Sequence, residues 1–140
     1  ASSFWRMRDA IGDVFQSLKS SISFDISAPI GSISVMLDAI NAELNDTYDN
    51  FVRLTYGHLG DSNIHLTITT GLEKDLDKIS EIVYRWTSRF HGSISGEHGI
   101  GVTKKNYLGL SRTEIEIELM RKLKHLLDPK NVLNPYRVIP

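Results

Sequence analysis

FVRLTYGHLGDSNIHLTIT, residues 51–69, is the stretch that indicates the fold of this chain. Two runs rich in β-branched and aromatic residues, Phe51 to Gly57 and Asn63 to Thr69, flank a short segment of Gly, Asp, Ser and Asn. This composition is typical of two strands joined as a β-hairpin. In the second run apolar and polar residues alternate, which predicts one buried face and one open face. The polar set, which we expect on the open face, is His65, Thr67 and Thr69.

Helix and strand patterns on both sides of the hairpin complete the plan of a small α+β domain. A strand over Ile22 to Ser27 and a helix opened by Pro29 precede the hairpin, and a second helix and a brief strand over Gly92 to Ser95 follow it. Apolar residues at helical spacing mark the two helices: Ile33, Met36, Leu37, Ile40 and Leu44, then Leu76, Ile79, Val83, Trp86 and Phe90. The order β-α-β-β-α-β predicts a ferredoxin-like split βαβ sandwich, an antiparallel sheet with both helices on one face.

Two further helices are predicted outside this unit. The first covers roughly residues 1–19, and the last follows a capping box that we assign to Ser111–Glu114 and ends at Asp128-Pro129. Each carries an apolar stripe that we expect to be buried: Phe4, Met7, Ile11, Phe15 and Leu18 in the first, and Ile115, Leu119, Leu123, Leu126 and Leu127 in the last.

The composition limits the classes of partner and site. A length of 140 residues suits a single domain, and a net charge of −1 offers no excess of positive charge for nucleic acid or an anionic membrane. Without cysteine, any metal must be held by nitrogen and oxygen ligands. No apolar run is long enough for a transmembrane segment. Because the chain opens with Ala1 and not with Met, we expect a fragment or a processed piece.

Histidine and glutamate side chains supply the candidate site. We place the second and fourth strands antiparallel to the first and third, so that the end of strand two, the start of strand three and the end of strand four share one edge of the sheet. His58, His65 and Glu97 fall at these three places. Two imidazoles and a carboxylate around an open position form a ligand set expected of catalytic zinc or a similar divalent ion. His98 would lie beside that ion.

Plainer interpretations of the same residues stay open at this level. A histidine in a hairpin is often a polar turn residue, and separated His and Glu residues often occur by chance. The glycines at 96, 99 and 101 resemble a phosphate-binding loop but lack the order of a dinucleotide fingerprint. We interpret Lys104-Lys105 as a solvated pair.

Two longer segments resemble a known family. YGHLGDSNIH, residues 56–65, and GSISGEHGIG, residues 92–101, resemble the signature segments in the C-terminal domain of FAD-linked 2-hydroxyacid dehydrogenases. This group includes enzymes that act on D-2-hydroxyglutarate, D-lactate and glycolate, and lies within the vanillyl-alcohol-oxidase-like flavoproteins. FDISAP at 24–29 and LDPKNVLNPY at 127–136 extend the resemblance over nearly the whole chain.

The resemblance implies a role for each candidate residue. It implies that His58, His65 and Glu97 bind the metal and that His98 is the base that takes the proton from the substrate hydroxyl. Arg8 stands where such enzymes present an arginine to the substrate carboxylate, although a solvated helix arginine is an equal reading. Asn134 matches a near-terminal asparagine that approaches the flavin, and Asn63 and Ser95 are candidates for supporting the ligands from behind.

Two departures from the family pattern bear on the substrate. The family usually has a basic residue where this chain has Ser23, and often Asn where it has Thr67. Loss of a cation at Ser23 argues against assuming a dicarboxylate such as 2-hydroxyglutarate. Ser62 replaces the more usual glycine and leaves the predicted ligands unchanged.

The resemblance also implies the surroundings of the domain. The 140 residues would form one C-terminal substrate- and metal-binding domain, with FAD held mainly by an N-terminal domain absent from this chain. The partners expected are a small 2-hydroxyacid, that FAD domain, and an electron acceptor protein or quinone. The compartment expected is the cytoplasm for a bacterial source or the mitochondrion for a eukaryotic one. Alone, the chain is expected to be inactive.

Two other functions compete with this one. A freestanding ferredoxin-like module could bind a small ligand or a metal on its open sheet face without catalysis. A zinc-dependent hydrolase could use Glu97 or His98 as its base. Turnover of esters or phosphates without flavin would favour the hydrolase.

Overall fold

A sheet of three antiparallel strands forms the centre of the molecule. The computed structural model describes residues 3–6, 10, 14, 17–58 and 60–140. Within this part of the chain the strands are β1 (Ile22–Ser27), β2 (Val52–His58) and β3 (Asn63–Thr69), in the spatial order β1-β3-β2. The first three of the four predicted strands are therefore confirmed to within a residue at each end, and the α+β class is confirmed with them.

The central strand β3 sets the direction of both neighbours. It pairs antiparallel with β1 and with β2, so β1 and β2 run parallel to each other on either side of it. Our expectation that the second strand runs opposite to the first is wrong. The α2 crossover carries the chain over the place that β3 fills, and a crossover of this kind joins parallel strands. The ends of β1 and β2 thus lie beside the start of β3.

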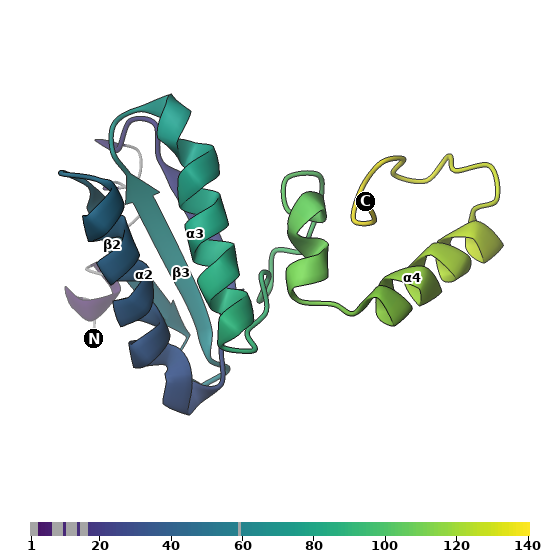
Figure 1. Cartoon of the computed structure of the whole chain (residues 1–140), viewed down its shortest axis with the longest axis horizontal. Helices are drawn as coiled ribbons and strands as arrows, with labels where there is room; N and C mark the ends of the chain where they lie inside the picture. The colour runs from purple at the N-terminus through teal and green to yellow at the C-terminus, as the bar shows by residue number, and fades with distance from the viewer. Residues whose placement is uncertain (1–2, 7–9, 11–13, 15–16, 59) are drawn as a thin grey trace.

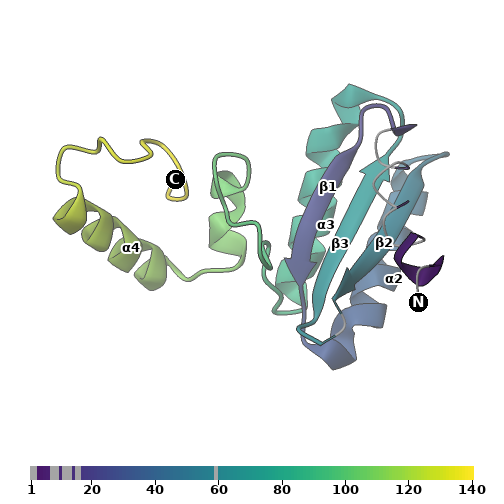
Figure 2. The ribbon, with the colours of Figure 1, turned by 180° about the vertical axis from the view of Figure 1, so that it is seen from behind.

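Two helices cover one face of the sheet. A short 3-10 turn, η1 (Ile30–Ser32), leads into α2 (Ile33–Thr47), and η2 (Glu73–Asp75) leads into α3 (Leu76–Arg89). Figures 1 and 2, which view the molecule from opposite sides, show α2 and α3 together on the same side of the sheet. The core between the layers contains Phe24, Ile26, Met36, Ile40, Leu44, Ile64, Leu66, Ile68, Ile79, Ile82 and Val83. The alternation in β3 is confirmed for the apolar set, because its isoleucines and Leu66 lie in this core. The expected open face is wrong, since His65, Thr67 and Thr69 are also buried, at 6%, 1% and 6% exposure.

The segment Gly92 to Ser95 forms only an isolated bridge. Ser93 pairs antiparallel with Ser27, and the two residues exchange backbone hydrogen bonds of 3.0 Å. The predicted fourth strand is thus reduced to one bridge within the described residues. The segment Gly92 to Ser95 begins beside the end of β1 and runs back along that strand. We had expected the segment to end at this edge of the sheet. Gly92 is required at this approach, since a Cβ on it would collide with the backbone oxygen of Ser27.

The C-terminal arm extends away from this α/β unit. It consists of η3 (Lys105–Leu110), α4 (Glu114–Leu127) and the tail that follows, and Figure 1 shows α4 beyond η3 from the sheet. The capping box of α4 is formed by Thr113 and Glu116, two residues later than the box that we assigned to Ser111–Glu114. The helix ends at Asp128 as predicted, where that side chain accepts hydrogen bonds from the amides of Val132 and Leu133.

The apolar stripe of α4 is not buried, which contradicts the prediction. Ile117, which lies outside the predicted stripe, is the buried residue of the helix. The members of the stripe are 49% to 83% exposed: Ile115, Leu119, Leu123, Leu126 and Leu127. An amphipathic sequence predicts a helix with an apolar face, but burial of that face needs a second surface, and none lies against it in the described chain.

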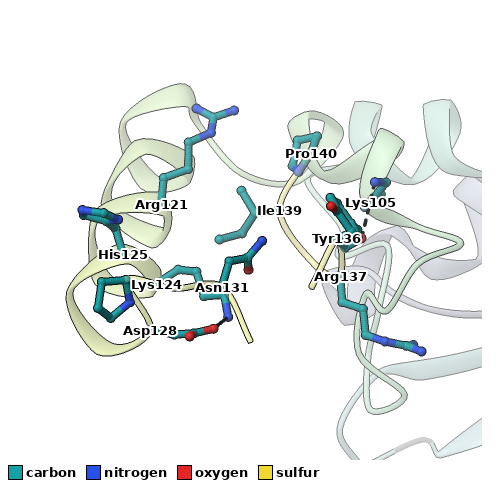
Figure 3. A pocket seen from close by; sticks show the side chains of 11 residues that line it. Lys105, Arg121, Lys124, His125, Asp128, Asn131, Tyr136, Arg137, Ile139 and Pro140 are labelled. Carbon is teal, nitrogen blue, oxygen red and sulfur yellow. Dashed lines mark hydrogen bonds and ion pairs between the residues drawn. The ribbon is translucent and has the colours of Figure 1, made fainter. Parts of the chain in front are cut away.

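The tail after α4 turns back toward the glycine-rich segment. The Val138 amide donates to the Gly101 carbonyl at 2.8 Å, and Lys105 Nζ lies 3.4 Å from the Tyr136 carbonyl oxygen. Figure 3 shows the hollow that α4 and the tail enclose, lined by basic side chains that include Arg121, Lys124 and Arg137.

The N-terminal prediction is only partly covered by the described residues. Residues 3–6, 10, 14 and 17 are helical, whereas Met7, Ile11 and Phe15 lie outside the described part of the chain. Phe4 is 74% exposed, so this member of the predicted stripe is not buried. Among the described residues, no helix combines the length and the apolar character that crossing a membrane requires.

Candidate functional site

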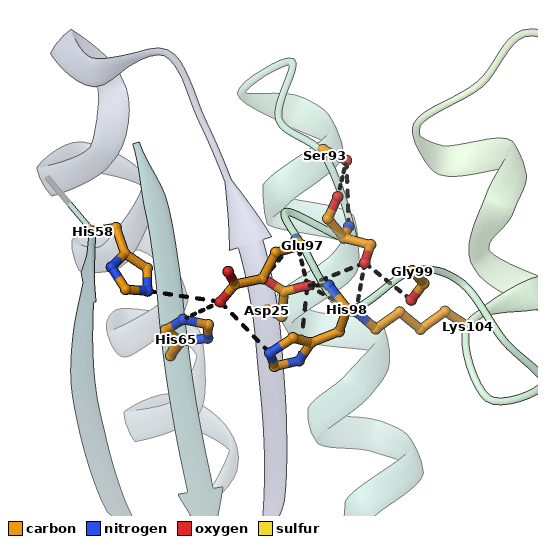
Figure 4. Close-up of polar contacts among 9 residues, drawn as sticks. Asp25, His58, His65, Ser93, Glu97, His98, Gly99 and Lys104 are labelled. Atoms are coloured by element: carbon orange, nitrogen blue, oxygen red, sulfur yellow. Dashed lines mark hydrogen bonds and ion pairs between the residues drawn. The ribbon is translucent and has the colours of Figure 1, made fainter. Parts of the chain in front are cut away.

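Three histidines converge on one glutamate at the polar face of the sheet. His58 ends β2 and His65 lies near the start of β3, while Glu97 and His98 follow the Ser93 bridge. The Nε2 atoms of His65, His58 and His98 lie 3.1, 3.7 and 3.7 Å from Glu97 Oε1. Figure 4 shows the four side chains pointing toward a common centre from three separate segments.

The register of the sheet explains this convergence. His65 pairs with Asp25 of β1 on one side and with Tyr56 of β2 on the other, and the chain after Ser93 runs back along β1. The Gly96 amide donates to the Asp25 carbonyl at 3.2 Å, which leaves Glu97 next to the middle of the sheet. The direction that we assigned to the fourth strand is wrong, yet Glu97 reaches the predicted place because it lies only four residues beyond the bridge.

His65 is stacked against two rings. The centroid of the Tyr56 ring lies 4.9 Å from that of His65, and the centroid of the His98 ring lies 5.3 Å from it. The His65 side chain is consequently only 8% exposed, whereas those of His58 and His98 are 53% and 62% exposed. Burial, followed by the nearby Glu97 charge, raises the pKa of the Tyr56 hydroxyl. One imidazole is thus fixed by packing, and two remain accessible.

A buried aspartate lies behind the histidines. Asp25 is 1% exposed, and its carboxylate accepts hydrogen bonds from the backbone amides of Glu97 (3.0 Å to Oδ2) and His98 (2.8 Å). Ser95 Oγ and Lys104 Nζ lie 3.1 and 3.7 Å from the same oxygen. Burial alone raises the pKa of the Asp25 carboxyl. The two amides, the Lys104 charge and the Ser95 hydroxyl outweigh burial and lower this pKa from 3.8 to about 2.

Sequence reasoning missed Asp25 and misjudged Lys104. Asp25 stands between Phe24 and Ile26 in a buried strand, where aspartate is disfavoured, and that position was the available signal. Lys104 is 8% exposed, so its interpretation as part of a solvated pair is wrong. Burial lowers the pKa of Lys104, and the Asp25 carboxylate opposes this shift. Sequence alone gives no sign that Lys104 rather than Lys105 turns inward.

The glycine-rich loop does not form a phosphate site. The amides of Glu97 and His98 donate to Asp25 and are not free for an anion. Gly96 lets the loop approach this closely, because a Cβ there would lie 2.5 Å from Asn63 Oδ1 and 2.9 Å from Asp25 Oδ1. Asn63 Oδ1 is itself buried without a hydrogen-bond partner among the described residues.

The donor set fits a divalent cation. Ligand atoms of Asp25, His65, Glu97 and His98 lie within 4.8 Å of one another. Imidazole nitrogen with carboxylate oxygen suits zinc and similar ions, and two ligands of a tetrahedral zinc lie about 3.3 Å apart, close to the 3.1 Å between His65 and Glu97. The predicted ligand His58 is not in this group, although its Nε2 lies 3.7 Å from Glu97 Oε1, and the Asp25 oxygens in the group already accept hydrogen bonds from the loop amides.

The remaining predicted site residues are Arg8 and Asn134. Arg8 lies outside the described residues. Asn134 lies in the tail beyond α4, which Figure 2 shows well separated from the sheet. Ser95 contacts the cluster through Asp25, as a supporting residue, and Asn63 approaches it through Gly96.

An uncharged hydroxyl pair lies next along the same face. Ser23 Oγ and Thr67 Oγ1 are 2.8 Å apart, and their pairing in the β1–β3 register is the one next to Asp25 and His65 on this face. The two positions that depart from the family pattern therefore contact each other beside the candidate site.

Comparisons with known proteins match this chain to one family and to several longer proteins. A family model described as FAD linked oxidases, C-terminal domain, matches residues 1–138. Over its whole length the chain is 42% identical to a mitochondrial D-2-hydroxyglutarate dehydrogenase of Arabidopsis thaliana. It is 38% identical to the mitochondrial enzyme of that name from Danio rerio, over 97% of the chain, and 33% identical to one from Stutzerimonas stutzeri, over 96%. The chain spans only 25%, 26% and 30% of the length of these relatives.

Proposed function

The chain belongs to the family of FAD-linked oxidase C-terminal domains, and from this premise we propose that it is the substrate-side part of a flavoenzyme that oxidises a D-2-hydroxyacid to the 2-oxoacid. The convergence of His58, His65 and His98 on Glu97 is the observation that carries the proposal. It brings the residues of both signature segments to one place. A portion that binds FAD belongs to the same intact protein, because the relatives are three to four times longer than this chain.

The four converging residues divide into two roles. His58, His65 and Glu97 hold a divalent ion, most suitably zinc, and the bound ion would supply Lewis acidity that favours loss of the substrate's hydroxyl proton. His98 accepts that proton, since its 62% exposed side chain lies at the open side of the cluster. The flavin would accept hydride from C2 of the substrate. The bound flavin would in turn be reoxidised by an acceptor protein or a quinone.

The substrate is a 2-hydroxyacid. The end of the substrate that is remote from its 2-hydroxyl group lies near Ser23 and Thr67. The relatives' names specify D-2-hydroxyglutarate, a dicarboxylate. The Ser23–Thr67 pair carries no charge to meet a second carboxylate. We therefore place substrates with one carboxylate, such as D-lactate, beside 2-hydroxyglutarate as candidates. The compartments proposed are the mitochondrion or the bacterial cytoplasm, as the relatives' names and sources suggest.

The experiment is an assay of the intact flavin-loaded protein with D- and L-2-hydroxyacids and an artificial electron acceptor. We expect oxidation of at least one D-acid, loss of rate with a chelator, and recovery with zinc. His98→Ala should lower kcat by roughly 10²- to 10⁴-fold while flavin stays bound. His58→Ala should reproduce the effect of the chelator. His125→Ala, on α4 and outside the site, is the matched control and should keep the rate.

Two outcomes would contradict this proposal. A flavin-loaded protein that oxidises none of the acids contradicts the proposal. Tight stoichiometric binding of FAD by the 140-residue chain alone contradicts the assignment of FAD to another portion.

For the fold, we infer a split βαβ sandwich in which the Ser93 bridge takes the place of the fourth strand.

A further inference from the structure

The loop that carries Glu97 and His98 is folded around one carboxylate. The amides of these two consecutive residues both donate to Asp25 Oδ2, at 3.0 and 2.8 Å. Ser95 Oγ lies 3.1 Å from the same oxygen and 3.0 Å from the Gly99 carbonyl oxygen. Figure 4 shows Asp25 at the centre of these contacts, behind the histidine cluster. The single buried side chain of Asp25 thereby holds the loop backbone from Ser95 to Gly99, directly or through Ser95.

A buried lysine balances this carboxylate. Lys104 Nζ lies 3.1 Å from Ser95 Oγ and 3.7 Å from Asp25 Oδ2, and the residue is 8% exposed. A buried carboxylate without an opposite charge is strongly disfavoured, and so is a buried ammonium. The lysine comes from the segment just before η3, so the pair also joins the site loop to the start of the C-terminal arm.

The direction of the Glu97 and His98 side chains depends on these contacts. Because both amides point at Asp25, the two Cα–Cβ bonds are fixed relative to the sheet, and Glu97 Oε1 reaches His65 Nε2 at 3.1 Å. The loop has three glycines, at 96, 99 and 101, and little regular structure of its own to hold it. Without the carboxylate, both amides would be left without partners and the loop free to turn.

We propose that Asp25 and Lys104 are positioning residues, whose buried pair sets the geometry of Glu97 and His98. The inference rests on the proposed function for its consequences in catalysis, but the geometry that it describes does not depend on which reaction takes place. Supporting groups behind metal ligands commonly change metal affinity by about 10- to 100-fold when they are removed.

The double variant D25N/K104M distinguishes a positioning role from a purely stabilising one. If the pair only stabilised the fold, the loop geometry would recover together with the stability. In D25N/K104M both charges of the pair are removed, so we expect stability nearer to the native value than in K104M, where the Asp25 carboxylate is left unpaired. The asparagine, however, has one accepting oxygen and one donating NH₂ group. Its oxygen has two lone pairs for the two amides and the Ser95 hydroxyl that donate to Oδ2, and its NH₂ group in the place of Oδ1 would face the Glu97 amide, which donates there at 3.2 Å. Positioning should therefore remain impaired while stability recovers.

The experiment uses the intact protein with variants D25N, K104M, K104R and D25N/K104M. Asp38→Asn, an exposed carboxylate on α2, and Lys105→Met, the neighbouring lysine, are controls with the same changes of charge. We measure Co²⁺ affinity from the visible spectrum of the bound ion, hydrogen exchange of the peptide that covers residues 95–99, and unfolding by urea. Exchange gives a readout that needs neither metal nor turnover.

We expect D25N and the double variant to bind Co²⁺ about 10- to 100-fold more weakly. They should exchange the Glu97 and His98 amides faster, whereas K104R should be closer to the native protein than K104M because it keeps the positive charge. Native metal affinity and native exchange in the folded double variant would overturn the inference. If the native protein oxidises no 2-hydroxyacid but the exchange results are as expected, the proposed function fails and the positioning role stands.

Discussion

The helices α3 and α4 have similar apolar periodicity, yet they lie in different surroundings. In α3, Ile79, Ile82 and Val83 are fully buried against the sheet. In α4 the corresponding stripe is exposed, and Leu119 and Leu126 are 57% and 75% exposed. The comparison teaches that periodicity predicts a helix and the face it will use, whereas burial depends on a partner surface that other parts of the chain supply.

The largest expected difference between the two regions comes from truncating matched side chains. Ile79→Ala removes a fully buried side chain from the core and should lower the free energy of unfolding by about 2 to 5 kcal/mol. Leu119→Ala removes a side chain that is already 57% exposed and should change it by about 0.5 kcal/mol or less. Urea unfolding followed by circular dichroism measures both. Equal losses would show that α4 is packed as tightly as α3.

A second test uses two glycines, one in the α/β unit and one in the C-terminal arm. Gly92→Ala would place a Cβ against the backbone oxygen of Ser27, and the strand cannot yield as a side chain can, so we expect a loss of about 3 kcal/mol. Gly109→Ala, in η3 at the base of the arm, meets no atom within 4 Å and should be nearly neutral. The same unfolding measurement applies. A neutral Gly92→Ala would mean that the Ser93 bridge is not required.

Acid should affect the α/β unit through Asp25. The folded protein lowers the pKa of this carboxyl from 3.8 to about 2, so its ionised form stabilises the fold by about 2 kcal/mol above pH 4. That contribution falls as the pH decreases through this range and is gone near pH 2. Because D25N lacks the titrating group, the difference in unfolding free energy between native and D25N protein should shrink by this amount from pH 6 to pH 2. A constant difference would contradict the assignment.

The smallest effect is expected at the start of α4. Thr113→Ala removes the cap that accepts from the Glu116 amide, and caps of this kind contribute about 1 kcal/mol to the helix they begin. Because α4 has an exposed stripe, its helix should fray without moving the midpoint of core unfolding. Helicity from circular dichroism should fall while the fluorescence of Trp86, on α3, measured in a Trp5→Phe background because the chain has two tryptophans, reports an unchanged midpoint. If both signals shifted together, the arm would unfold cooperatively with the core.

The sequence was sufficient for the α/β unit because its elements carry local signals. Alternation in β3, the hairpin composition and the stripes of α2 and α3 predicted each element to within a residue or two. The signature segments likewise singled out His58, His65, Glu97 and His98, and the structure brings all four together. Their roles as ligands and base stay predictions that the assays above test.

What only the tertiary structure decided are the relations between distant segments. The direction of the strands, the reduction of Gly92 to Ser95 to a single bridge, and the exposure of α4 each depend on which surfaces meet. The same holds for Asp25 and Lys104, which are 79 positions apart and become one buried pair behind the site. Local composition determines whether a segment forms a helix or a strand, because that preference arises within a few residues. The burial and pairing of a charge arise from the folded whole.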